Sequence, residues 1–138
     1  MTEQIEFAGT EKAEDGQRKQ CRNLLTDFLA KNPDVSGQMI LLYPAGVPLA
    51  STWQGTVDPI LVGAICAAVK ITFQHLCEGL KKGNLERLFV NSENGKIIIQ
   101  NAGPKAILVT IMSFDVDFNR IGFLTADLSK KIHKALHD

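Results

Sequence analysis

The stretch DPILVGAICAAVKITFQHLCEGLKK, residues 58–82, decides which fold is expected for this chain. An aspartate at position 58 can accept hydrogen bonds from free amide groups, and proline at position 59 suits the first helical position. Two lysines and Gly83 follow the apolar residues, as is typical of a helix end. The sequence therefore predicts a helix from residue 59 to about residue 82.

This helix is apolar nearly all the way round until Gln74. One apolar set consists of Leu61, Ala64, Ala68, Ile71 and His75, and a second consists of Ile60, Gly63, Ala67 and Val69. A helix in a small domain usually has one solvated face, so burial on two sides is expected. One side faces a sheet and the other requires a partner. The small residues favour close packing against the sheet over a cavity.

Two more helices and five strands are predicted around it. An amphipathic helix covers residues 18–31 and stops before Pro33, and a final helix starts at Asp117 or Asn119. The predicted strands are 38–43, 48–53, 85–91, 96–100 and 105–114. The last of these is the most continuously apolar, so we expect it in the middle of the sheet. The element order is αββαβββα, an α/β (α+β) class.

The length and charge limit the possible functions. At 138 residues the chain fits one domain, placed at residues 17–138 after a polar extension at 1–16 that is expected to be disordered. Fifteen basic and fifteen acidic residues balance, which argues against a nucleic-acid partner. The first residues lack the apolar core of a signal peptide. The apolar runs 59–69 and 106–112 are shorter than the roughly 20 residues of a membrane span. No integral membrane segment is expected.

The cysteines and other reactive residues give no catalytic or metal site. Three cysteines without a Cys-x-x-Cys pair predict inert thiols in a reducing, cytoplasmic setting. Cys66 and Cys77 with His75 are the alternative as metal ligands, but their spacing does not suit a zinc site. Asp115 and Asp117 suit helix capping better than acid–base chemistry. His75 is expected to be packed or at an interface rather than a general base. No phosphate-binding loop occurs, and we expect no enzyme activity and no cofactor.

Two features have open alternatives. Trp53 either anchors an interface or covers the core. The last helix is locally basic, which suits either a solvated face or an acidic partner, and the first of these is favoured; its basic residues are Lys130, Lys131, His133, Lys134 and His137.

The chain resembles the Roadblock / dynein light chain family, which is related in architecture to longin and profilin domains. The likeness covers about residues 18–136. It rests on Val35-Ser36-Gly37-Gln38, Gly46 with Pro48-Leu49-Ala50-Ser51, the alanine-rich helix after Asp58, Leu85-Glu86-Arg87-Leu88-Phe89-Val90 before Asn94-Gly95, and Asn119-Arg120-Ile121-Gly122. The resemblance implies a Roadblock/longin-like fold with a central five-stranded, mainly antiparallel sheet and helices on both faces.

The resemblance also implies a function. Family members form dimers in which the third strands pair and the central helices pack side by side, and they regulate Ras-like small GTPases or act as scaffolds. We therefore expect a non-catalytic homodimeric regulator or scaffold that pairs with itself or with another Roadblock-like chain. The expected dimer interface consists of Ala64, Ala67, Ala68, Ile71, His75, Leu88 and Val90. The alternatives are a profilin- or sensor-like module that binds a small ligand, or a dynein-type light chain adaptor.

Overall fold

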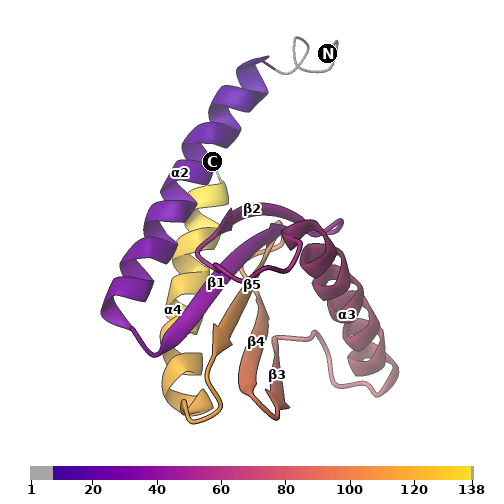
Figure 1. The fold of residues 1–138 in the computed structure, drawn as a ribbon. Helices are drawn as coiled ribbons and strands as arrows, with labels where there is room; N and C mark the ends of the chain where they lie inside the picture. Colours follow the sequence, from indigo (N-terminus) through magenta and orange to yellow (C-terminus); the bar gives the residue numbers. More distant parts are fainter. Residues whose placement is uncertain (1–7, 138) are drawn as a thin grey trace.

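The computed structural model describes residues 8–137, in which one sheet lies between helices (Figure 1). In chain order the elements are α2 (Ala8–Lys31), β1 (Val35–Leu42), β2 (Val47–Ser51), α3 (Pro59–Gly79), β3 (Arg87–Ser92), β4 (Gly95–Asn101), β5 (Ala106–Met112) and α4 (Phe118–His137). The predicted αββαβββα order is confirmed.

The five strands form one sheet in the order β2-β1-β5-β4-β3, and every neighbouring pair is antiparallel. Strand β5 lies in the middle. Its residues are buried except at Ile111, as the prediction of a strand covered on both faces requires. Strands β2 and β3 are the two edges of the sheet.

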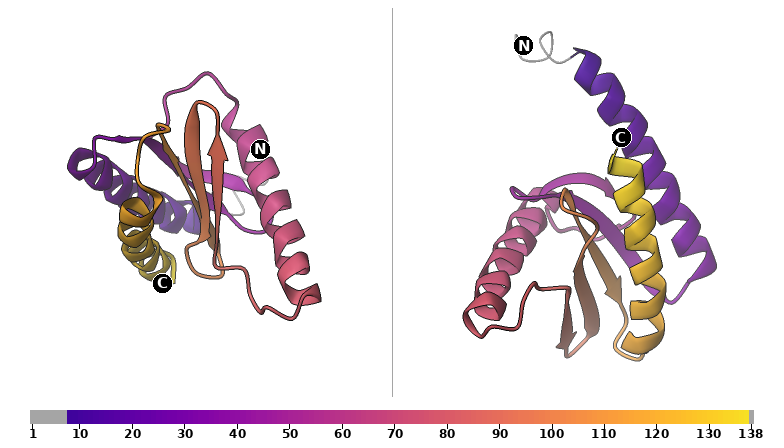
Figure 2. Two further views of the ribbon diagram at one scale, coloured as in Figure 1. Left: turned by 90° about the horizontal axis from the view of Figure 1, so that it is seen from below. Right: turned by 180° about the vertical axis from the view of Figure 1, so that it is seen from behind.

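Helices cover both faces of the sheet, as expected. Helices α2 and α4 lie side by side on one face and α3 lies on the other (Figure 2). The larger apolar cluster lies beneath α2 and α4 and includes the fully buried Leu25, Ile40 and Ile132. A smaller cluster on the α3 side includes Met39 and Ile107. The core is therefore divided unequally, and α3 has the smaller share of it.

The start of α3 follows the sequence prediction. Asp58 caps the helix by accepting a hydrogen bond from the backbone N–H of Ile60 at 3.0 Å, and proline occupies the first turn. The turn between β1 and β2 presses against this end of the helix. A Cβ on Gly63 would lie 1.9 Å from the carbonyl oxygen of Gly46, whose φ is +83°. Two glycines therefore allow two backbone segments to touch.

The structure differs from the prediction at the N-terminus. Helix α2 begins at Ala8 instead of residue 18, so residues 8–16 of the predicted extension are helical. Residues 1–7 of that extension lie outside the described residues. The strand ends differ from those expected by one to three residues, which is usual for element boundaries.

Candidate interaction surface

Helix α3 exposes large apolar side chains along its outer side. Leu61, Ile65 and Leu76 are 55%, 53% and 51% exposed, and Ile60 and Leu80 at the two ends of the helix are more exposed still. Only Gly63, Cys66 and Ala67 of this helix are buried. A soluble monomer rarely exposes so continuous an apolar surface, and such surfaces usually mark an interaction site. We call the exposed residues Leu61, Ala64, Ile65, Ala68, His75 and Leu76 the outer stripe.

An apolar groove of about 350 Å³ runs between α3 and the sheet. Val62 and Ile65 line it from the helix, Ile97 and Ile111 line it from the sheet, and Trp53 closes one side. Close packing without a cavity was expected here, and that expectation was wrong. The physical reason is that the first half of α3 touches the sheet mainly through the small residues Gly63, Cys66 and Ala67, which leaves the side chains of Val62 and Ile65 beside an unfilled groove. Trp53 is half-buried, covering the smaller cluster and lining the groove.

The predicted interface residues on α3 fall into two groups. Ala64, Ala68 and His75 are exposed on the outer stripe, and Ile71 is partly buried. Ala67 is only 3% exposed and packs in the cluster on the α3 side of the sheet. Within the chain itself Ala67 therefore belongs to the core, and a second copy would not reach it without a rearrangement.

The predicted residues Leu88 and Val90 lie on β3, the edge strand beside α3. Leu88 packs against the cluster on the α3 side, and Val90, two residues on, shares that face. Both are partly buried. Strand β3 is hydrogen-bonded to β4 along one side only, so its other backbone edge is unpaired within the described chain. The outer stripe and this open edge form one candidate surface.

Gln74 fixes the loop that leads from α3 to β3. Its Oε1 accepts a hydrogen bond from the backbone N–H of Leu85 at 2.8 Å. Its Nε2 donates to Asn84 Oδ1 at 3.1 Å and to Glu78 Oε1 at 2.8 Å. One side chain therefore holds the second half of α3 and the approach to β3 in a fixed relation.

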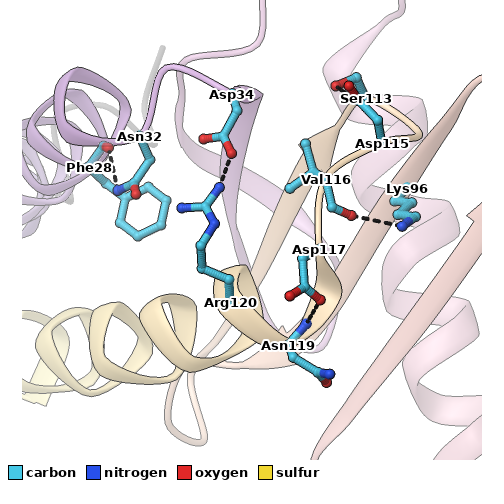
Figure 3. A network of polar contacts seen from close by, with 10 residues as sticks. All are labelled: Phe28, Asn32, Asp34, Lys96, Ser113, Asp115, Val116, Asp117, Asn119 and Arg120. Carbon is cyan, nitrogen blue, oxygen red and sulfur yellow. Dashed lines mark hydrogen bonds and ion pairs between the residues drawn. The ribbon is translucent and has the colours of Figure 1, made fainter.

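The two candidate acid–base residues, Asp115 and Asp117, both hydrogen-bond to neighbouring residues of the chain. Asp117 caps α4 by accepting a hydrogen bond from the N–H of Asn119 at 2.9 Å, and Asp115 accepts one from the hydroxyl of Ser113 at 2.8 Å (Figure 3). Nearby, Arg120 of α4 forms an ion pair with Asp34 at the start of β1. Asp117 therefore has the capping role that the sequence favours, whereas Asp115 bonds within the turn before α4 and does not cap the helix.

The three cysteines are free thiols. Burial raises the pKa of Cys21 to about 11, and burial also raises the pKa of Cys66. A thiol that resists ionisation is a poor nucleophile and a poor metal ligand. No group of three or more potential metal ligands occurs within residues 8–137.

One charged side chain is drawn into the apolar surface of α3. The ammonium group of Lys70 lies 3.4 Å from the centre of the Tyr43 ring, and partial burial lowers the pKa of Lys70.

Among the described helices, α3 alone is long and apolar enough to cross a membrane by length and composition. Core helices of soluble proteins also pass this test.

Comparisons with known proteins agree with this architecture. The family model of the Roadblock/LC7 domain matches residues 22–112. Two uncharacterised proteins of Methanocaldococcus jannaschii are each 29% identical over 104 residues, covering 75% of this chain and 90% of each relative.

Among solved structures, MglB of Myxococcus xanthus has a TM-score of 0.78 at 13% identity, covering 87% of this chain and 90% of that chain. A Roadblock/LC7 domain from Streptomyces avermitilis has a TM-score of 0.77 at 14% identity, with coverages of 85% and 98%. Domains of this kind are generally non-catalytic regulators or adaptors. On its architecture and on the match over residues 22–112, the chain belongs to the Roadblock/LC7 family.

Proposed function

We propose that the chain acts as a homodimeric, non-catalytic regulator or scaffold that binds a Ras-like small GTPase. The observation that carries this proposal is the outer stripe of α3, an apolar surface on a helix of which only three residues are buried in the core. Self-association through α3 and the open edge of β3 would remove that surface from water. Burial of apolar area contributes about 25 cal/mol per Å², so burying this surface would favour association.

Two copies related by a two-fold axis would bring α3 beside its counterpart and continue the sheet across β3. An isologous contact of this kind needs a surface that is complementary to itself. Small residues at Ala64 and Ala68 allow two helices to approach closely, while Leu61 and Ile65 supply apolar area. In place of the buried Ala67, we therefore assign Leu61 and Ile65 to the interface.

Regulation of a GTPase would be conformational. A dimer that binds one nucleotide state better than the other shifts the population toward that state, by no more than its difference in affinity. Binding of this kind requires no catalytic residue on this chain. It requires a composite surface that discriminates between two arrangements of the switch loops.

Substitution of Ala68 by glutamate tests the self-association. Ala68→Glu places a charge on the exposed outer stripe and should shift the molar mass measured by light scattering from two chains toward one. The matched control is Ala30→Glu, which adds the same side chain at an exposed alanine of α2, on the opposite face of the sheet. A wild-type chain that is monomeric at micromolar concentration, or equal effects of the two variants, would contradict the dimer.

Partner binding is tested separately, with a purified Ras-like GTPase of the same organism in its GDP form and in a non-hydrolysable GTP form. We expect affinities that differ by about tenfold, which corresponds to about 1.4 kcal/mol. Equal affinity for both forms would exclude regulation by population shift and leave a scaffold role. Absence of binding in either form would contradict the GTPase proposal without affecting the dimer.

A further inference from the structure

A polar pocket of about 470 Å³ lies on the face of the sheet opposite α3, between the start of β3, the end of β4 and α4. Arg87 and Gln100 are register partners on β3 and β4, so their side chains lie on the same face. Ile98, two residues before Gln100, is buried in the cluster beneath α2 and α4, which identifies that face. Ser129 and Lys130 complete this part of the pocket from α4.

Two nearly buried side chains in this pocket have unsatisfied polar atoms. Gln100 is 5% exposed and Ser129 is 7% exposed. Within the described chain neither Gln100 Oε1 nor Ser129 Oγ has a hydrogen-bond partner. Proteins rarely leave buried polar atoms unpaired, because each such atom loses its bonds to water and gains none in return. Both side chains line the same pocket, and because their unpartnered atoms have almost no surface open to solvent, a rotation of each side chain would bring them to a polar group bound there.

The charged residues of the pocket are also without ion pairs. Arg87 and Lys130 form no salt bridge with any residue of the described part of the chain, whereas the neighbouring Lys131 pairs with Asp127 at 3.4 Å. Glu86 lines the same pocket. Two cations therefore outnumber one carboxylate at a site where hydrogen-bonding groups are already in place.

We propose that this pocket binds a small molecule that carries a phosphate or carboxylate group. Arg87 and Lys130 would donate to the anionic oxygens, and the Ser129 hydroxyl would add a neutral donor. Gln100 Oε1 and Glu86 would accept hydrogen bonds from a hydroxyl or amino group on the same molecule. The pocket volume falls within the range of about 300–1,000 Å³ that small-molecule sites occupy.

The site is separate from the outer stripe, although Arg87 belongs to β3, the strand that pairs in the proposed dimer. Its side chains lie on the α4 face, while the outer stripe lies on the opposite face of the sheet. Light scattering of each variant beside the titration therefore distinguishes a failure of ligand binding from a failure of self-association.

The test is a titration of the full, ¹⁵N-labelled chain with inorganic phosphate and, separately, with citrate at constant ionic strength, followed by amide chemical shifts. We expect saturable shifts centred on Arg87, Gln100 and Ser129 with at least one probe. Saturation by phosphate alone supports a phosphate-bearing ligand, and saturation by citrate alone supports a carboxylate. Shifts that rise without saturation for both probes would overturn the proposal.

Variants separate a site from general attraction to basic residues. Arg87→Gln should weaken binding at least about tenfold, because charge-assisted hydrogen bonds are the strong ones. Ser129→Ala, which changes no charge, should also weaken it. Lys131→Gln also removes one positive charge, but from a residue of α4 that does not line the pocket, and it should leave the affinity unchanged. Equal weakening by Arg87→Gln and Lys131→Gln would reduce the effect to that of an adventitious ion only. Should Arg87→Gln disturb the fold, the exposed Lys130→Gln replaces it in the same comparison.

Discussion

Single residues determine how closely the turn after β1 approaches α3. Gly46 and Gly63 face each other so tightly that a methyl group on either would meet backbone atoms of the other. Backbone atoms cannot turn aside as a flexible side chain can. The contact therefore constrains residue identity more strongly than the surrounding apolar packing does.

Gly63→Ala should destabilise the fold by about 1–3 kcal/mol, the range typical of an overfilled core. The expected loss outweighs the helix propensity that alanine gains over glycine, about 1 kcal/mol. Urea denaturation with an unchanged slope measures the difference. Gly79→Ala is the control, because nothing lies within 4 Å of a methyl group added there. A neutral or stabilising Gly63→Ala would contradict the close approach.

The three thiols should differ in reactivity with an alkylating reagent at pH 8. Cys77 is only partly buried and should be modified first, while Cys21 and Cys66 should stay protected until the chain unfolds. Burial and a raised pKa both disfavour the reactive thiolate at Cys21 and Cys66. Mass spectrometry of timed samples gives the order. Cys77→Ser should abolish the fast phase, and rapid modification of Cys21 would show that α2 opens from the sheet.

At the scale of the element, α3 shows what an apolar pattern can and cannot predict. Its start is predictable because Asp58 and Pro59 are local signals with a local structural effect. Its orientation is not, because a helix that is apolar all round gives no signal for which side meets the sheet. Ala67 was accordingly assigned to the interface, and it packs within the core.

The polar pocket had a signal that was overlooked. Gln100 follows the run Ile97-Ile98-Ile99 near the end of a strand whose last buried residues are Ile98, Ile99 and Gln100, so a polar side chain there requires a partner. No comparable signal existed for the helical residues 8–16. They carry many charges and little apolar periodicity, and their helix continues from the amphipathic residues that follow.

Gln74 links α3 to the loop before β3, and its substitution should destabilise that loop more than the rest of the fold. Gln74→Leu removes the acceptor for the Leu85 N–H and should cost about 0.5–1.5 kcal/mol, the usual contribution of one hydrogen bond. Hydrogen exchange should quicken at the Leu85 amide before it quickens in β5. Thr72→Ala serves as the control, because the Thr72 hydroxyl bonds only to Ala68 within the helix. Unchanged exchange at Leu85 would mean that other contacts hold the loop.

At the scale of the whole molecule, the order of elements along the chain and the central place of the last strand followed from patterns that span the chain. A continuous apolar strand belongs in the centre of a sheet, and β5 lies there. The groove beside α3 did not follow, because it depends on how far the helix at Val62 and Ile65 stands from the strands. Side-chain size alone does not determine that separation.

The two edge strands of the sheet differ in how well they are covered, and this difference limits how further copies of the chain can pair with the sheet. Helices α2 and α3 both contact β2, and Arg18 donates a hydrogen bond to the Leu49 carbonyl at 2.7 Å. Strand β3 contacts α4 through the rings of Phe89 and Phe118, but among the described residues no helix residue hydrogen-bonds to its outer backbone edge. A chain with one guarded edge and one open edge can extend its sheet once and then has no free edge left. In the proposed dimer, growth through strand pairing would therefore end at two copies instead of continuing into a filament.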